Sequence, residues 1–307
     1  MHLHYLIKQC RPIKPINQAQ KGFSLIEFMI AITISMFIML GVSVAWQTAF
    51  STQLTQTDAS RLNETIRFAM DLLSREIKQA GLINTVNTSL SESNFCSTTG
   101  VGAAITGIND PATINPLVAG INFAGATVTI PNKSDAIRVR YYGEDTTAGT
   151  EATTDCIGNT APNGTLIEDT LYVAADPSNS NEPTLWCHTS NPNSAGAPAQ
   201  PMVAGIESLQ LLYGEDLDQD GIINHYVPWQ MVTNPDNVLS VKISIVARSP
   251  NAVSIQVPAG KIYRHFGSAY TDPGGTAGTQ FTDPGDRRIR LPQPLSTEIA
   301  VRNFSHC

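Results

Sequence analysis

The chain has 307 residues, a net charge of −7 and 42% hydrophobic residues, which is enough apolar material for the packed core of one good-sized domain or two small ones. The first 22 residues hold four basic residues and no acid, so in the remainder 15 basic residues face 26 acidic ones. This acidic balance, without a basic cluster beyond the N-terminus, argues against a nucleic-acid partner.

An apolar segment near the N-terminus predicts a membrane anchor. Basic residues up to Lys21 precede a run of roughly 24 mostly apolar residues, from Phe23 to Trp46, which is long enough to cross a bilayer as a helix. The next basic residue is Arg61, so the positive-inside rule places the N-terminus in the cytoplasm and the rest of the chain outside. A plain signal-anchor has the same features, whereas a secretory signal cut after Ala45 requires a shorter apolar run.

One acidic residue, Glu27, interrupts this apolar run. A carboxylate in lipid costs on the order of 2.5–3.5 kcal/mol, so its presence usually has a function. The segment KGFSLIEFMIA, residues 21–31, resembles the class III signal of type IV prepilins, with Gly22 before the cleavage site and Glu27 fifth in the mature chain. The resemblance implies that a prepilin peptidase cleaves between Gly22 and Phe23 and methylates the new α-amine of Phe23.

The resemblance also implies a role for Glu27 in assembly. Its carboxylate would pair with an N-terminal amine inside the fibre and set the register between subunits. An ammonium and a carboxylate in an apolar bundle are each unfavourable alone and far less so together, which agrees with this role.

Beyond Trp46 the apolar residues thin to a stripe with helical spacing, and Gly81 is a suitable helix stop. The stripe comprises Phe50, Leu54, Leu62, Ile66, Ala69, Leu73, Ile77 and Ala80. We therefore expect one long helix; two helices separated near Gly41 or at residues 48–52 are the alternative. The expected division is a leader over residues 1–22, a helix over 23–81 (transmembrane over 23–46, amphipathic over 47–81) and a periplasmic or extracellular head over 82–307.

The head has the pattern of a β-rich domain. Strands are expected over residues 127–130, 136–142, 165–174, 185–188, 206–213, 238–248 and 253–257, and long loops over 89–125, 143–164, 176–201 and 249–285. Within one expected strand apolar residues alternate with Ser240, Lys242 and Ser244, which predicts a sheet with one wet face. The fold class is therefore α+β: a long N-terminal helix, its first half membrane-embedded, packed on an antiparallel β-sheet head with long loops, as in type IV pilins.

Four cysteines remain when Cys10 is set aside with the leader: Cys96, Cys156, Cys187 and Cys307. Export to an oxidising compartment favours disulfides, and four cysteines permit three connectivities. We hypothesise a Cys156–Cys187 bridge, because these residues flank the expected strand over 165–174, and by elimination a Cys96–Cys307 bridge. None of the cysteines forms a C-x-x-C pair, so redox catalysis and a compact zinc site are poorly supported.

Residues 216–223, DLDQDGII, resemble the first half of an EF-hand calcium loop, with carboxylates at positions 1, 3 and 5 and a glycine at position 6. The candidate calcium ligands are Asp216, Asp218, Asp220 and the carbonyl of Ile222, with Glu215, Asn224 or water as further ones. Position 12 is Val227 in place of the usual glutamate. An acidic hairpin turn is the alternative, but three crowded carboxylates repel one another without a cation, which favours calcium.

Several later segments resemble PilW-type minor pilins: residues 73–81, 205–214, 286–290 and 301–303. This resemblance implies a minor pilin that helps to initiate type IV pilus assembly at or near the fibre tip. Its partners would be other minor pilins, the major pilin, a tip adhesin, the prepilin peptidase and the inner-membrane assembly platform. The protein would be a single-pass inner-membrane protein with a periplasmic head before assembly and part of the extracellular fibre afterwards.

Motifs typical of catalysis are missing from the sequence, which has no H-E-x-x-H, no G-x-S-x-G and no phosphate-binding glycine loop. We therefore expect no enzyme and, apart from calcium, no cofactor. Arg287, Arg288 and Arg290 form either a solvated face or a set of partners for acidic residues. The alternative functions are a minor pseudopilin of a type II secretion system and a fibre-borne adhesin, and a membrane-tethered periplasmic enzyme is the least supported.

Overall fold

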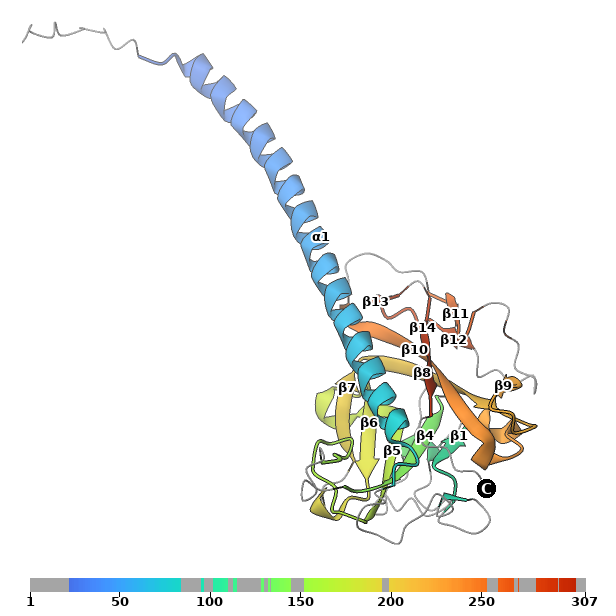
Figure 1. The fold of residues 1–307 in the computed structure, drawn as a ribbon. Helices are drawn as coiled ribbons and strands as arrows, with labels where there is room; N and C mark the ends of the chain where they lie inside the picture. The colour runs from blue at the N-terminus through green and yellow to red at the C-terminus, as the bar shows by residue number, and fades with distance from the viewer. Residues whose placement is uncertain are drawn as a thin grey trace, which may run out of the picture. The chain divides into compact units, whose positions relative to one another are not determined.

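The structure, a computed structural model, describes residues 22–83, 95–96, 102–109, 113–114, 128–129, 132, 134–144, 152–194, 199–252, 259–267, 270, 280–291 and 293–301. The chain divides into two compact units, one ending at Thr52 and the other, here called the head unit, beginning at Gln53. A single helix, α1 (Leu25–Gln79), begins in the first unit and ends in the head unit (Figure 1). The one long helix expected from the sequence is therefore confirmed, and the alternative of two helices separated near Gly41 or at residues 48–52 is wrong.

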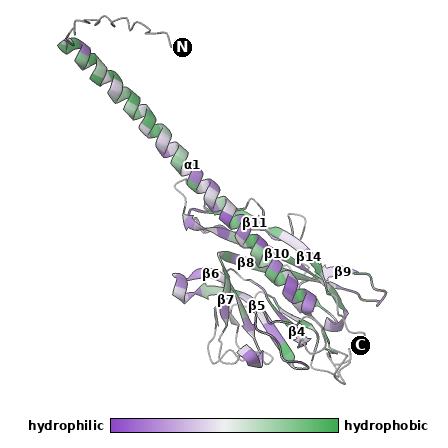
Figure 2. Ribbon diagram, turned by 60° about the vertical axis from the view of Figure 1, so that its left-hand side comes forward, coloured by the Kyte–Doolittle hydropathy of each residue, from purple (hydrophilic) through white to green (hydrophobic). Residues whose placement is uncertain are grey.

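The first part of α1 is apolar and open. An 18-residue window of the helix has a mean hydropathy of 2.4 and none of it is buried, so its length and composition suffice to cross a membrane (Figure 2). Two hydroxyl groups here bond to the helix itself: Thr33 Oγ1 donates to the carbonyl of Ile30 and Ser35 Oγ to that of Ile32, both at 2.8 Å. Because these polar groups are satisfied within the helix, an apolar environment can surround them.

The second part of α1 supplies one wall of the head core. Leu62, Ile66, Ala69, Leu73 and Ile77 are buried in the same cluster as apolar residues of both large sheets. The expected apolar stripe is wrong at its start, because Phe50 and Leu54 remain 55% and 51% exposed. The cause is the step of eight residues from Leu54 to Leu62, which rotates the side chain by roughly 80° at 100° per residue.

The helix ends as its sequence predicts. Gly81 adopts a φ of 72°, a left-handed conformation that glycine tolerates better than other residues. Its N–H donates to the carbonyl of Arg140 at 2.9 Å, and the N–H of Tyr142 donates to the carbonyl of Leu82 at 2.8 Å. These bonds connect the end of the helix to a strand of the first sheet.

The head unit is built from antiparallel sheets (Figure 1). The first sheet has the order β1 (Ile105–Ile108), β4 (Ala136–Tyr142), β5 (Leu166–Asp176), β6 (Glu182–Thr189) and β7 (Gln200–Ala204). The second has the order β13 (Arg288–Arg290), β10 (Val238–Ala252), β8 (Ile206–Glu215) and β9 (His225–Val227), with β14 (Leu295–Ala300) also paired to β10. Two small sheets pair β2 (Thr113–Ile114) with β3 (Val128–Thr129) and β11 (Ile262–Arg264) with β12 (Gln280–Thr282). The α+β class with one long helix and antiparallel sheets is thus confirmed.

The expected strands over 136–142, 165–174, 185–188, 206–213 and 238–248 correspond to β4, β5, β6, β8 and β10. Of residues 127–130 the structure describes 128–129, which form β3, and 253–257 lie outside the described residues. Two expected loops were wrong, because β1 and β2 lie within 89–125 and β11 and β12 within 249–285. These short strands form through pairing with strands distant in sequence, such as Ile105 opposite Val139, so local patterns do not reveal them.

The prediction that one face of β10 is exposed to solvent is also wrong in part. Ser240 and Ser244 are buried, while Lys242 between them is partly exposed. For Ser244 the reason is His265, which follows β11 and lies fully buried: its ring nitrogens lie 2.9 Å from Ser244 Oγ and 3.1 Å from Ser208 Oγ. Ser240 Oγ instead lies 3.0 Å from the hydroxyl of Tyr226 on β9. Protein partners therefore satisfy both hydroxyl groups without water.

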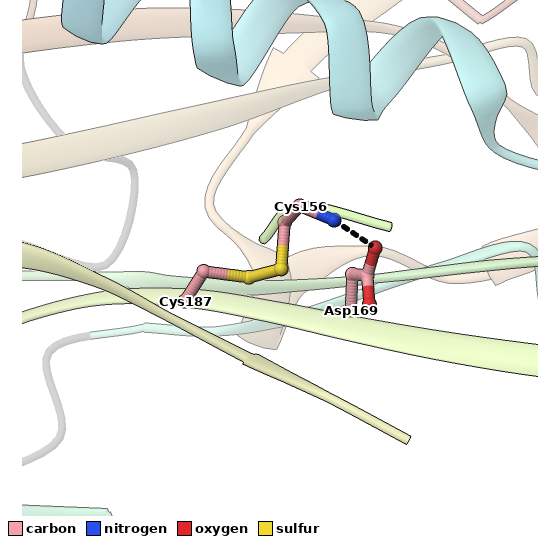
Figure 3. A group of neighbouring side chains, drawn as sticks. All are labelled: Cys156, Asp169 and Cys187. Carbon is pink, nitrogen blue, oxygen red and sulfur yellow. Dashed lines mark hydrogen bonds between the residues drawn. A yellow bond between two sulfur atoms is a disulfide. The ribbon is translucent and has the colours of Figure 1, made fainter. Parts of the chain in front are cut away.

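Cys156 and Cys187 form a disulfide, the pairing expected from the sequence, with their Cα atoms 6.3 Å apart. The bridge connects the segment before β5 to β6, and the backbone N–H of Cys156 donates to Asp169 Oδ2 on β5 at 2.9 Å (Figure 3). Cys96 is also disulfide-bonded, but Cys307 lies outside the described residues, so the Cys96–Cys307 pair stays a prediction.

Candidate functional site

The predicted cleavage site lies immediately before α1. Phe23 is 89% exposed, and a Cβ atom added to Gly22 would meet no heavy atom within 4 Å. The fold of the single chain therefore has no need of glycine at this position. Any requirement for Gly22 would come from the enzyme that recognises it.

Glu27 is exposed and bonds back to the start of its own helix. Its Oε2 accepts a hydrogen bond from the N–H of Ser24 at 3.0 Å, and the carbonyl of Ser24 accepts from the N–H of Phe28 at 3.2 Å. This is the glutamate half of a capping box, in which Ser24 is the N-cap and Glu27 occupies the third helical position. Our sequence reading did not assign Ser24 this role, although the S-x-x-E spacing contains the signal.

The position of this carboxylate suits a pairing with a terminal amine. The N–H that Glu27 accepts belongs to the residue directly after Phe23, where cleavage would create the new α-amine. The carboxylate thus lies one residue from that amine in its own chain and is exposed to other chains. The carboxylate can therefore pair with the N-terminal amine of its own chain or of another chain, and neither pairing requires a change in the helix.

The acidic segment after β8 forms the turn of a hairpin with β9, as the alternative interpretation of this motif expected. It also brings together the carboxylates of Asp216, Asp218 and Asp220, with one oxygen of each within 4.8 Å of the others. The two oxygens of Asp216 accept the N–H groups of Gln219 at 2.7 Å and Gly221 at 2.8 Å. Burial alone would raise the pKa of Asp216, but these two bonds hold it below its usual value, so the carboxylate keeps its charge.

The further calcium ligands considered from the sequence have other roles. Glu215 is buried, and its carboxylate accepts the N–H groups of Thr233 at 3.0 Å and Asn234 at 2.7 Å and lies 3.1 Å from His225 Nε2. The side-chain oxygen of Asn224 accepts the N–H of Leu217 at 2.5 Å. The three aspartates fit a cation in charge and spacing, but water would have to complete the coordination.

The structure decides the question left open for the C-terminal arginines: two of them meet acidic neighbours. Arg290 on β13 is fully buried and bonds to Glu207 on β8 at 2.5 and 2.8 Å, to Asp283 at 3.1 Å and to Asp286 at 3.0 Å. Arg248 on β10 bonds to Glu182, Glu207 and Asp286, and Arg288 bonds to Glu182. We call these seven residues the arginine network.

The arginine network closes the end of the second sheet and reaches β6 of the first. Burial raises the pKa of Glu207, and the hydrogen bonds and charge of Arg290 oppose that rise. The same partnership raises the pKa of Arg290, although burial acts against it. Removal of the arginine would therefore leave a buried carboxylate without its main partner.

Comparisons with known proteins identify two matching family models and a similar solved structure. Residues 17–43 match the family described as the prokaryotic N-terminal methylation motif, and residues 170–303 match the family described as Type IV Pilus-assembly protein W. A type IV-like pilin from Thermus thermophilus is similar in structure, with 15% identity and a TM-score of 0.42 over 80% of this chain and 99% of that chain. No curated protein matches the sequence.

The methylation motif and the apolar helix make this chain similar to type IV prepilins. Within that class, the C-terminal part is similar to PilW-type pilus-assembly proteins. The matched region 170–303 contains the arginine network and the acidic turn, whereas the methylation motif contains Gly22, Phe23 and Glu27.

Proposed function

We propose that this protein is a minor pilin that helps to initiate type IV pilus assembly and lies at or near the fibre tip. The observation that carries the proposal is the pair of matches at opposite ends of the chain: a methylation motif over 17–43 and a pilus-assembly family over 170–303. The open apolar surface of the first part of α1 supports it, because such a surface needs lipid or other apolar helices around it.

The proposed mechanism is packing. The first part of α1 anchors the protein in the inner membrane with its N-terminus in the cytoplasm and its head in the periplasm. After cleavage the helix joins the helical bundle of the fibre, where Glu27 sets the register. The head then contacts other minor pilins, the major pilin and a tip adhesin.

The proposed role is structural, and the protein is not proposed to be an enzyme. The described part of the chain contains one histidine bonded to two serine hydroxyl groups, the Ser208–His265–Ser244 cluster, which resembles the parts of a hydrolase site. All three side chains are buried, and burial lowers the pKa of His265 to about 4. The cluster therefore supports the sheet instead of presenting a nucleophile to a substrate.

N-terminal mass spectrometry of the protein from membranes and from sheared surface fibres tests the proposal. We expect a chain beginning at N-methylated Phe23 in both fractions. A Gly22→Val variant provides the matched control, because the fold leaves room for the larger side chain and only recognition by the peptidase should be lost. An intact Met1 or a start at Trp46 in the wild-type protein would contradict prepilin processing.

A gene deletion separates the proposed pilus role from the alternatives. Loss of surface pili with normal enzyme secretion supports a minor pilin, and the reverse result supports a pseudopilin of a type II secretion system. Normal pili that no longer attach to surfaces would instead support an adhesin. Each outcome therefore indicates a different class of partner for a protein with this N-terminal helix.

A further inference from the structure

A cleft of about 560 Å³ lies on the face of the second sheet that points away from the core. Lys242 on β10 stands between the core residues Val241 and Ile243, so its side chain is on the opposite face of the sheet. Its direct partners on the two neighbouring strands are Leu212 on β8 and Glu298 on β14. We call this site the aromatic cleft, and the described residues that line it include Leu212, Tyr226, Lys242, Phe266, Tyr270 and Glu298.

Tyr226 on β9 organises the polar groups of the cleft. It lies opposite Gly214, where an added Cβ atom would come within 2.8 Å of Tyr226 Cε1 and 2.6 Å of Ser240 Oγ, so the glycine leaves room for the ring. The Tyr226 hydroxyl donates to the carboxylate of Glu298 and lies 3.0 Å from Ser240 Oγ. Lys242 Nζ lies 3.3 Å from the centroid of the Tyr226 ring and 3.7 Å from Glu298 Oε2. The tyrosine therefore holds an ammonium and a carboxylate side by side.

Phe266 and Tyr270, in the segment after β11, form an aromatic wall beside these groups. Their ring centroids are 5.5 Å apart at an interplanar angle of 68°, and both side chains are half-buried. Phe266 has a φ of 60°, a left-handed conformation that is strained for an aromatic residue and that the surrounding structure must hold in place. The buried neighbour His265, whose ring nitrogens bond to Ser244 and Ser208, fixes the segment to the sheet. The wall is thus a constrained part of the head.

The cleft presents its charged groups to solvent without a net charge. The side chains of Lys242 and Glu298 are 35% and 47% exposed, and among the described lining residues they are the two charged ones. A partly exposed ion pair contributes little to stability, so both groups can bond to a ligand at small cost to the fold. The ammonium covers one face of the Tyr226 ring, and Phe266 and Tyr270 therefore supply the remaining aromatic surface.

We propose that the aromatic cleft binds a neutral saccharide. A sugar ring has an apolar C–H face, which packs against an aromatic wall, and neighbouring hydroxyl groups, each of which can donate and accept. Glu298 would accept from one hydroxyl group while Lys242 donates to the next one. The volume of the cleft is within the range of about 300–1,000 Å³ that small-molecule sites have.

The same groups disfavour other classes of ligand. An anion would meet the carboxylate of Glu298, a cation would meet the ammonium of Lys242, and a purely apolar ligand would remove water from both charges without replacing its hydrogen bonds. No residue of α1 takes part in the cleft, so the inference does not depend on the proposed role in assembly.

Binding to immobilised glycans tests the proposal, with the full-length protein in a detergent whose headgroup is not a sugar. The probes are neutral oligosaccharides of hexoses and N-acetylhexosamines, with matched oligosaccharides that end in sialic or uronic acid. We expect binding to at least one neutral oligosaccharide, competition by the same sugar in solution, and an affinity that changes little between about 50 and about 500 mM sodium chloride.

Two variants locate the binding in the cleft. Glu298→Gln keeps an acceptor for Tyr226 but loses the charge, and we expect affinity for the neutral oligosaccharide to fall by about tenfold or more. Phe266→Leu removes the aromatic ring and should weaken binding by a similar factor. Glu64→Gln and Phe68→Leu, the same changes at exposed positions of α1, provide the matched controls and should bind as the wild type does.

Thermal unfolding of each variant shows whether it is folded, and Glu298→Gln decides the question if Phe266→Leu does not fold, because Glu298 is an exposed side chain. Three results would overturn the proposal: no binding of the wild type to any neutral oligosaccharide, tighter binding to the acidic ones, or wild-type affinity in a folded variant of the cleft.

Discussion

The two units of the chain differ in whether their charged and apolar groups are exposed or buried. In the first unit the apolar side chains of α1 and the carboxylate of Glu27 are exposed. In the head unit the apolar residues form a closed core, and even a fully buried arginine, Arg290, has three acidic partners within 3.1 Å. The comparison indicates that the head completes its interactions within one chain, while the first unit leaves its interactions for lipid or other subunits.

Two glutamates of the same helix show this difference at the level of single residues. Glu27 is exposed and bonds only to the backbone N–H of Ser24. Glu76 is fully buried and bonds to the side chain of Arg75 at 2.9 Å. A change at Glu27 should therefore affect assembly and leave the head stable, whereas changes among buried charges of the head should do the reverse.

The largest expected effect lies in the arginine network. Replacement of Arg290 by Met leaves Glu207 buried beside a side chain that cannot donate. Loss of one partner of a buried ion pair costs about 3–5 kcal/mol, so the free energy of unfolding should fall by that amount. Denaturant unfolding of the full-length protein in detergent measures it.

The exposed Arg264 on β11 offers the matched control, since Arg264→Met should change stability by less than about 0.5 kcal/mol. Cleavage after Gly22 should be normal in both variants. A stable Arg290→Met head would show that the arginine network does not stabilise the head, and impaired cleavage would show that the two units are not independent.

The second effect concerns Glu27 and acts on assembly. Gln in place of Glu27 can still accept the N–H of Ser24 but has no charge for an N-terminal amine. We expect a roughly tenfold or greater loss of incorporation into fibres, which corresponds to about 1.4 kcal/mol, with unchanged cleavage and an unchanged head. Immunoblots of sheared fibres against membranes provide the measurement.

Glu64→Gln serves as the control for Glu27→Gln, because it removes an exposed charge from the same helix within the head unit. Fibre incorporation equal to the wild type in Glu27→Gln would mean that the charge has no role in register. A destabilised head would mean that the first unit supports the second, which contradicts the comparison above.

The sequence predicted the parts of the molecule that depend on interactions between residues close together in the chain. The helix from Leu25 to Gln79 and its stop at Gly81 follow from spacing and composition over neighbouring residues. The methylation motif matched by residues 17–43 is likewise contained in one short segment. The long strands β4, β5, β8 and β10 have enough alternation or apolar length to be recognised in isolation.

The features that sequence patterns missed depend on contacts between distant segments. Arg290 bonds to Glu207 only when β13 and β8 lie on either side of β10. The burial of Ser244 likewise depends on His265 from another segment. None of these residues carries a local signal that separates it from an exposed polar residue of the same type.

The smallest expected effect concerns the acidic turn, the part of the head that is least closed. Asp218 and Asp220 are exposed, and their carboxylates lie with that of Asp216 within 4.8 Å. If the turn binds calcium, as its spacing predicts, a cation would remove this repulsion without affecting the core. For a site of roughly millimolar affinity, millimolar calcium should stabilise the head by about 0.5–1 kcal/mol.

Calorimetric titration and thermal unfolding with calcium and with a chelator measure this effect. The double variant Asp218→Asn and Asp220→Asn should abolish the calcium-dependent shift, while Asp71→Asn, an exposed acid on α1, should retain it. An equal shift with all of these proteins would indicate binding elsewhere in the head, and no shift in the wild type would leave the hairpin turn as the whole role of this segment. In that case the repulsion among the three aspartates would be relieved by solvent alone, and stability should rise with added sodium chloride, because salt screens exposed charges.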